Sequence, residues 1–211
     1  MGSPFPTLIL LGIYLSIVKY GPKYMESQPP MKSRWPLVVY NSGITALNAW
    51  MAYELLTCGL ARSYNFVCQL VDFSNNEYEV RVCVQYHILK LPSITVFLLF
   101  QIAKAIWWYY FSKLLEFMDT VFFILRKKPR QLTFLHVYHH STMFMFWWVG
   151  ARFVPGGCAL SGAMVNCFVH VIMYAYYALA ALGPKVQKYL WWKKYLTILQ
   201  LVRFDLNHKH P

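Results

Sequence analysis

Long apolar runs separated by short polar loops dominate this chain of 211 residues. A helix that crosses a membrane needs about 20 apolar residues, and it satisfies its own backbone hydrogen bonds, as lipid requires. The pattern therefore predicts an all-α fold, a polytopic transmembrane helix bundle with about six spans. The candidate runs begin near Pro6, Pro36, Ile94, His136, Leu160 and Trp192.

The composition supports a membrane protein. Hydrophobic residues make up 58% of the chain and charged residues 13%, about half the charged share of a soluble domain. Disordered, collagen-like and disulfide-scaffold classes are excluded, and too little polar surface exists to cover a soluble globule. The five Cys contain no C-x-x-C pair, so no zinc or redox motif is readable.

The formal net charge of +12 is concentrated in loops. Loops 19–35, 126–130 and 185–194 are basic, whereas 61–81 is mixed and 154–159 is uncharged. Because basic loops stay on the cytosolic side, these three are expected there, with the N-terminus on the far side. The expected partner of this charge is the lipid bilayer, and no nucleic acid is expected.

Polar residues inside the runs are costly, at about 2.5–3.5 kcal/mol each for ionisable groups on insertion scales. In the third run, Lys113, Glu116, Asp119 and Thr120 follow spacings that place them on one helical face. One interpretation is a buried ion pair that fixes helix packing. The other is the polar wall of an active-site cavity near the cytosolic end.

The fourth run opens with His136, His139 and His140, which fall within an arc of about 100°. Together with His170 and Asp119 they could hold a single metal ion such as zinc. Alternatively, one imidazole attacks an activated acyl group without any metal, oriented by its neighbours. These four are the only His among seven that lie in predicted spans, too few for a two-iron oxygenase.

Further polar positions occupy the last two runs. Tyr and Asn often join membrane helices through hydrogen bonds, so a packing role is the simplest explanation for most of them. His170, which lies on the same helical face as the other polar positions of the fifth run, favours a functional role instead. The positions are Asn166, His170, Met173, Tyr174 and Tyr177 in the fifth run, and Thr197 and Gln200 in the sixth.

These residues carry a resemblance to the fatty acid elongases. Residues 136–140 resemble the H-x-x-H-H box of that family, 113–120 resemble K-x-x-E-x-x-D-T, and 170–177 resemble H-x-x-M-Y-x-Y-Y. Residues 197–203 resemble T-x-x-Q-x-x-Q, except that Arg203 replaces the second Gln. The likeness covers roughly 4–82 and 102–202 and is greatest to the animal elongases of very long, often polyunsaturated chains.

The resemblance implies a 3-oxoacyl-CoA synthase of the endoplasmic reticulum membrane. Such enzymes join a long-chain acyl-CoA to malonyl-CoA and release CO2 and CoA, with no metal or other cofactor. The family fold is a helical barrel of seven helices, six of which enclose a substrate tunnel open to the cytosol. Further expected partners are the reductases and dehydratase of the elongation cycle and a second copy of the chain.

The resemblance also implies roles for individual residues. His139 would hold the chain as an acyl-imidazole, and His170 would assist decarboxylation or condensation. The supporting catalytic residues would be His136 and His140, which orient the nucleophile, Asp119 and Glu116 as acceptors, and Lys113 as their counter-ion. The substrate-binding residues would be Asn166, Tyr174, Tyr177, Thr197 and Gln200, joined on grounds of charge alone by Arg126, Lys127, Lys128 and Arg130 for the phosphates of coenzyme A.

The sequence departs from the family pattern in two places. Residues 82–101 form an atypical insert on the luminal side, and 204–211 form an atypical polar tail. We therefore expect one membrane-embedded domain over 1–211 that lacks the seventh helix, with activity impaired by truncation. Two other functions stay open: a proton-coupled transporter or channel with a path lined by His and Asp, and a metal-dependent lipid hydroxylase.

Overall fold

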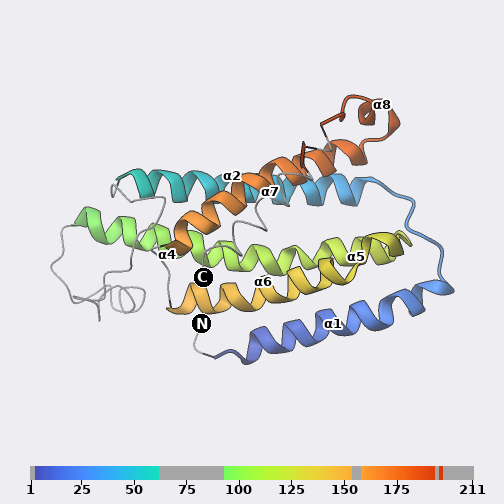
Figure 1. Cartoon of the computed structure of the whole chain (residues 1–211), viewed down its shortest axis with the longest axis horizontal. Coiled ribbons are helices and arrows are strands. Elements are labelled where there is room, and N and C mark those ends of the chain that lie inside the picture. The colour runs from blue at the N-terminus through green and yellow to red at the C-terminus, as the bar shows by residue number, and fades with distance from the viewer. Residues whose placement is uncertain (1–2, 62–92, 154–157, 193–194, 197–211) are drawn as a thin grey trace. The chain divides into compact units, whose positions relative to one another are not determined.

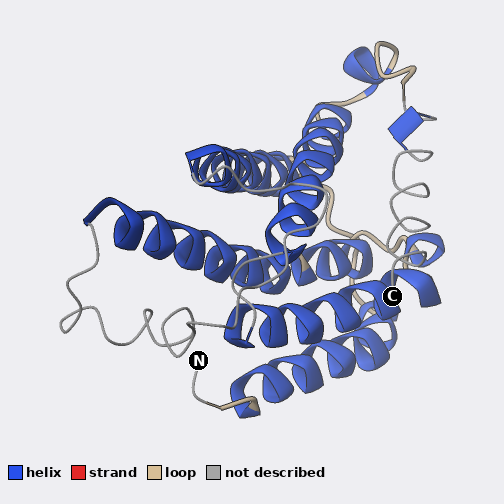
Figure 2. Cartoon of the chain, turned by 60° about the vertical axis from the view of Figure 1, so that its left-hand side comes forward, coloured by secondary structure: helices blue, strands red, loops and turns tan. Residues whose placement is uncertain are grey.

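The computed structural model describes residues 3–61, 93–153, 158–192 and 195–196. All regular structure in these ranges is helical, and no strand occurs in them (Figure 2). The long helices in Figure 1 are α1 (Phe5–Glu26), α2 (Trp35–Ala61), α4 (Ser93–Leu115), α5 (Phe117–Leu125), α6 (Phe134–Phe153) and α7 (Cys158–Ala181), with the short η1 (Pro129–Gln131) and α8 (Pro184–Gln187) between or after them.

The chain divides into two compact units. The first comprises Met1–Lys32 and Glu54–Ala163, and the second comprises Ser33–Tyr53 and Met164–Pro211. Helices α1, α4, α5 and α6 lie wholly in the first unit. The second contains most of α2, most of α7 and α8.

The helix starts agree with the apolar runs. Five of the six expected starts lie within two residues of a helix start, and the sixth run extends beyond the described residues. Two helices, Phe5–Glu26 and Leu160–Ala181, are long and apolar enough to cross a membrane, among the residues described. The all-helical fold is thus confirmed for the described residues, with two candidate membrane helices, whereas the number of spans and the barrel stay predictions.

The third run is divided at Glu116. Helix α4 ends at Leu115 and α5 begins at Phe117, although the Glu116 N–H still donates to the Ser112 carbonyl at 2.9 Å. Residues 93–101 of the expected insert belong to α4, the helix that also carries Lys113, and 82–92 lie outside the described residues.

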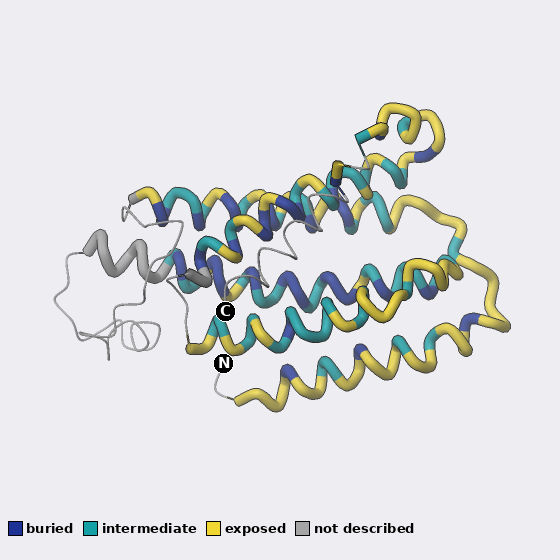
Figure 3. The backbone as a smooth tube through the Cα atoms, in the orientation of Figure 1, coloured by how far each residue is buried: buried dark blue, intermediate teal, exposed yellow. Residues whose placement is uncertain are grey.

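Helix α1 buries two polar side chains and exposes a row of apolar ones. On α1, Ile9, Ile13 and Ile17 are exposed, whereas Thr7 and Tyr14 are buried. Figure 3 shows the same arrangement along α1, where most of the tube is exposed and buried positions recur at intervals. Water would not tolerate so large an apolar surface, but lipid does.

Aromatic rings pack α1 against its neighbours. Helix α1 contacts α5 and α6, and α4 contacts α6. At the centre Tyr14 stacks on Phe117 with ring centroids 4.0 Å apart, and Phe117 meets Phe144 edge-on at 5.0 Å. Tyr110 stacks on the other side of this cluster, 5.1 Å from Phe144. The cluster therefore joins α1, α4, α5 and α6.

The C-terminal ends of α1 and α5 satisfy each other's backbone groups. The Met31 N–H donates to the Leu125 carbonyl at 2.8 Å, and Lys127 Nζ donates to the Glu26 carbonyl at 3.2 Å. Terminal carbonyls of a helix lack intrahelical partners, so these bonds stabilise both ends. The first two basic loops thus lie at the same end of the first unit, in agreement with their expected common side.

Gly21 allows close approach of α1 to α5. A Cβ atom at this position would lie 3.1 Å from Ile124 Cδ1 and 3.3 Å from Ile124 Cγ2. We expect Gly21→Val to destabilise the fold by about 1–3 kcal/mol, because the added methyl groups overpack this contact. Thermal unfolding in detergent measures the change.

Gly12→Val is the matched control, because nothing lies within 4 Å of the Cβ position at Gly12 on the same helix. Gly21 also precedes Pro22, which disfavours a helical residue with a Cβ before it. Adding Ile124→Val to Gly21→Val removes the Cδ1 atom from the contact and should recover part of the loss. Equal unfolding temperatures for Gly21→Val and Gly12→Val, or no recovery in the double variant, would contradict the close approach.

Candidate functional site

A buried ion pair marks the junction of α4 and α5. Lys113 Nζ lies 2.6 Å from Glu116 Oε1, and the two side chains are 2% and 1% exposed. The ammonium also lies 4.5 Å from the centroid of the Tyr109 ring. A charge at this depth requires such partners, since its desolvation is not offset by water. The pair therefore holds the first polar positions of the 113–120 stretch in the interior of the first unit.

Thr120 connects this stretch to the histidines of α6. Thr120 Oγ1 lies 2.8 Å from His136 Nε2 and 3.1 Å from the Tyr14 hydroxyl. Thr120 and Tyr14 are both buried. Three helices, α1, α5 and α6, thus meet in one chain of hydrogen bonds.

The three rings of the histidine box lie in succession. His136 and His140 have ring centroids 4.4 Å apart, and His140 and His139 have centroids 5.5 Å apart. Phe123 of α5 covers the other side of His136 at 5.2 Å. All three imidazoles are partly buried, whereas Tyr138 between them is exposed. The three histidines, which helical spacing predicted to share one arc, therefore form a cluster on the inner side of α6.

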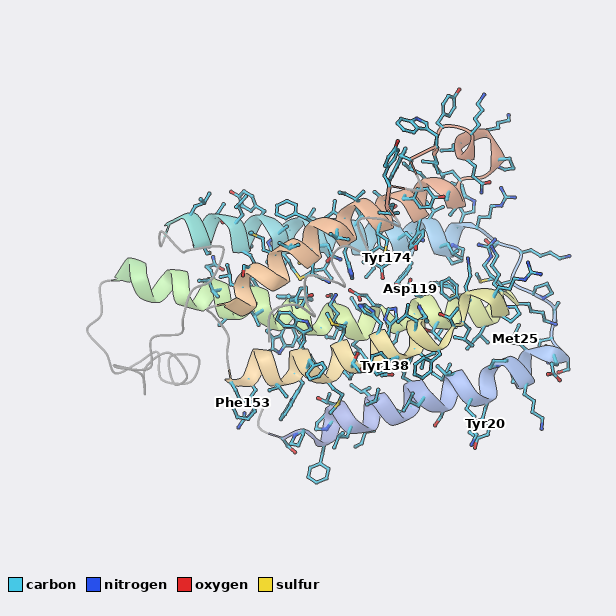
Figure 4. The ribbon with its side chains drawn as sticks, viewed as in Figure 1. Tyr20, Met25, Asp119, Tyr138, Phe153 and Tyr174 are labelled. Carbon is cyan, nitrogen blue, oxygen red and sulfur yellow. The ribbon has the colours of Figure 1, made fainter. Side chains whose placement is uncertain are left out.

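Asp119 lies on α5 next to Thr120 and is half-buried (Figure 4). Within the described part of the chain, no group of three or more His, Cys, Asp or Glu side chains is arranged to hold a metal ion. The described residues therefore offer no set of ligands for the metal ion that the sequence left open.

The second unit holds the fifth-run residues. Asn166, His170 and Tyr174 are buried, and Tyr177 is more exposed. The rings of His170 and Tyr174 lie 5.7 Å apart, and Tyr40 of α2 meets Tyr174 edge-on at 6.2 Å.

The role of His170 relative to His139 stays a prediction, because the two residues belong to different units. Thr197 and Gln200 lie outside the described residues, so their substrate-binding role also stays a prediction.

The basic residues after α5 differ from one another. Lys127 adopts φ 51° and binds the end of α1 through its ammonium, so its role is at least partly structural. Arg126 is half-buried, whereas Lys128 and Arg130 are exposed at the start of η1. Lys128 and Arg130 are thus the better placed to meet a phosphate in solution.

Sequence reasoning missed the polar groups of α1 and α2. Thr7 bonds the Tyr110 hydroxyl at 2.9 Å, and Tyr14 bonds Thr120. Asn41 and Asn48 are buried on α2, with their Nδ2 groups donating to the carbonyls of the preceding turn. The available signal was a hydroxyl or amide inside an apolar run, which lipid leaves unsatisfied unless another group supplies a partner.

Comparison with known proteins identifies the family. The family model described as GNS1/SUR4 family (ELO) matches residues 1–210. The chain belongs to this family. Very long chain fatty acid elongase 4 of Macaca mulatta is 49% identical over 210 residues, which is 100% of this chain and 60% of the relative.

Two other relatives agree with this membership. Very long chain fatty acid elongase 2 of Mus musculus is 45% identical over 210 residues, which is 100% of this chain and 64% of that protein. Very long chain fatty acid elongase 7 of Drosophila melanogaster is 44% identical over 211 residues, 100% of this chain and 58% of that protein. The chain therefore spans 58–64% of the length of these curated relatives.

The buried ion pair makes a stability prediction. Lys113→Met leaves the Glu116 carboxylate buried without its ammonium partner, so we expect a loss of about 3–5 kcal/mol in the free energy of unfolding. Adding Glu116→Gln to the same protein should recover much of the loss. Thermal unfolding of the purified protein in detergent measures both effects.

Lys104→Met serves as control, since Lys104 is an exposed residue of the same helix. A loss at Lys104 as large as that at Lys113 would show that burial of the pair is not the cause.

Proposed function

We propose that this chain is a condensing enzyme of fatty acid elongation in the endoplasmic reticulum membrane. It joins a long-chain acyl-CoA to malonyl-CoA and gives 3-oxoacyl-CoA, CO2 and CoA, without a metal or other cofactor. The named elongases among its relatives support this assignment. The structural observation that carries it is the cluster of three imidazoles fixed by Thr120 inside an apolar helix unit.

In the first half-reaction, a nitrogen of the His139 imidazole attacks the carbonyl carbon of the acyl thioester. The C–N bond forms, the C–S bond breaks, and the ring proton goes with the departing CoA thiolate. Imidazole is a competent nucleophile near neutral pH, and an acyl-imidazole remains reactive toward carbon nucleophiles. The order of the three rings supports this role, because His140 lies between His136 and His139 and contacts both.

In the second half-reaction, malonyl-CoA loses CO2 and the electron pair remains on the carbon next to its thioester. That carbon attacks the acyl carbonyl, the C–N bond breaks, and the departing ring nitrogen takes up one proton from solvent, which regenerates the neutral imidazole. His170 assists this step, with Asn166, Tyr174 and Tyr177 as neighbouring binding groups on α7. The product needs reduction and dehydration before another cycle, so the corresponding enzymes are the expected partners.

The covalent step gives a direct prediction. Incubation of the purified chain with a long-chain acyl-CoA should add the mass of one acyl group, mapped by peptide mass spectrometry to His139. His139→Ala should lose the adduct, because no other group would take the acyl chain. Intact-mass spectrometry before and after addition of malonyl-CoA measures formation and consumption.

Tyr138→Phe is the control for this experiment, since Tyr138 adjoins His139 but is exposed on the other side of α6. An adduct that persists in His139→Ala would place the nucleophile elsewhere. Activity that follows added zinc or iron would favour the hydroxylase interpretation.

The exposed cations after α5 give a second prediction. We propose that Lys128 and Arg130 bind the phosphates of coenzyme A through charge-assisted hydrogen bonds. Lys128→Gln with Arg130→Gln should slow adduct formation from acyl-CoA at low concentration, with little effect on acyl-pantetheine, which lacks the nucleotide phosphates. The comparison of the two donors at low and high salt measures the effect; equal losses with both donors would contradict it.

A further inference from the structure

Tyr14 of α1 ends a chain of hydrogen bonds that begins at the histidine box. Its hydroxyl lies 3.1 Å from Thr120 Oγ1, which lies 2.8 Å from His136 Nε2. Tyr14 is 2% exposed, and its ring stacks on Phe117 at 4.0 Å. None of the motifs that carry the elongase resemblance includes this residue.

The directions of the two bonds follow from counting protons. A threonine hydroxyl has one proton to donate and two lone pairs, and a phenol has one proton. Among the described residues, Thr120 is the partner of the Tyr14 hydroxyl. If Thr120 donated to Tyr14, the phenolic proton would be buried without an acceptor, which is costly. Tyr14 therefore donates to Thr120.

The second bond then has its direction as well. If Thr120 accepted a proton from His136 Nε2 as well, its own proton would be buried without an acceptor among the described residues. Thr120 therefore donates to His136 Nε2. A nitrogen that accepts a hydrogen bond is unprotonated, which places the ring proton of His136 on Nδ1.

We infer that Tyr14 is a positioning residue that, through Thr120, holds His136 as the neutral tautomer protonated on Nδ1. The effect on catalysis rests on the proposed function, whereas the His136 tautomer follows from the hydrogen bonds alone. His136 packs 4.4 Å from His140, which packs 5.5 Å from His139, the proposed nucleophile. A fixed His136 ring thereby fixes the rings that back the nucleophile.

The chain supplies a matched control in Tyr110. Its hydroxyl bonds Thr7 at 2.9 Å, and its ring stacks on Phe144 at 5.1 Å. Both tyrosines thus form one Tyr–Thr hydrogen bond between α1 and the α4–α5 region, and both stack on a phenylalanine. Only the Tyr14 bond continues to a histidine among the described residues.

The test compares Tyr14→Phe with Tyr110→Phe in the full chain in lipid bilayers. Nitrogen NMR of isotope-labelled histidine distinguishes the two neutral tautomers, and the His136 signal is assigned by its loss in His136→Asn. The wild type and Tyr110→Phe should show His136 protonated on Nδ1, whereas Tyr14→Phe and Thr120→Val should show a mixture. Thr120→Ser, which keeps the hydroxyl, should restore the wild-type signal.

The acyl-adduct rate provides the second readout. Tyr14→Phe should lower it about fivefold, the scale of one neutral hydrogen bond, and should add nothing to Thr120→Val in the double variant. An unchanged His136 tautomer in Tyr14→Phe, or an equal change in Tyr110→Phe, would overturn the inference. A wild type that forms no adduct but shows the expected tautomers would contradict the proposed function alone.

Discussion

A polar group inside these helices is stabilised only by a partner within the protein, because lipid supplies none. The Lys113–Glu116 pair and the bonds of Thr120 are the main instances in the first unit. Each joins groups that would otherwise oppose burial. The hydrophobic effect does not drive helices together in lipid, since lipid tails are as apolar as the side chains. Close packing and polar contacts therefore determine together which helix faces meet.

The same constraint brings the chemical groups together. Thr120 lies one residue beyond Asp119 and four beyond Glu116, and its bond to His136 ties this polar stretch to α6. The aromatic cluster around Phe117 fills the space beside that stretch and keeps α1 close. Packing and hydrogen bonding thus position the histidine box by separate means. Overpacking at Gly21 would disturb the packing, and loss of the Tyr14 or Thr120 hydroxyl would disturb the hydrogen bonding.

Periodicity and charge predicted much of this arrangement. The helix starts and the inward stripe at Lys113 and Glu116 follow from the apolar pattern and the cost of buried charge. The common end of the first two basic loops follows from their charge. The break at Glu116 could not be read, since no proline or glycine marks it. Tyr14 could not be paired with Thr120, because spacing along one helix does not determine which neighbouring helix it meets.

The hydroxyl chain connects α1 to the histidine box and so to the chemistry proposed for it. An imidazole next to two further imidazoles has several nearly equal proton arrangements, and the proposed nucleophile among them would require one. A buried hydroxyl with a single proton resolves that choice without adding a charge, which lipid would make costly. A carboxylate in the place of Tyr14 would also fix a tautomer, but it would attract a proton to His136 and favour the imidazolium form. A tyrosine is therefore suited to the proposed mechanism, in which the imidazoles stay neutral.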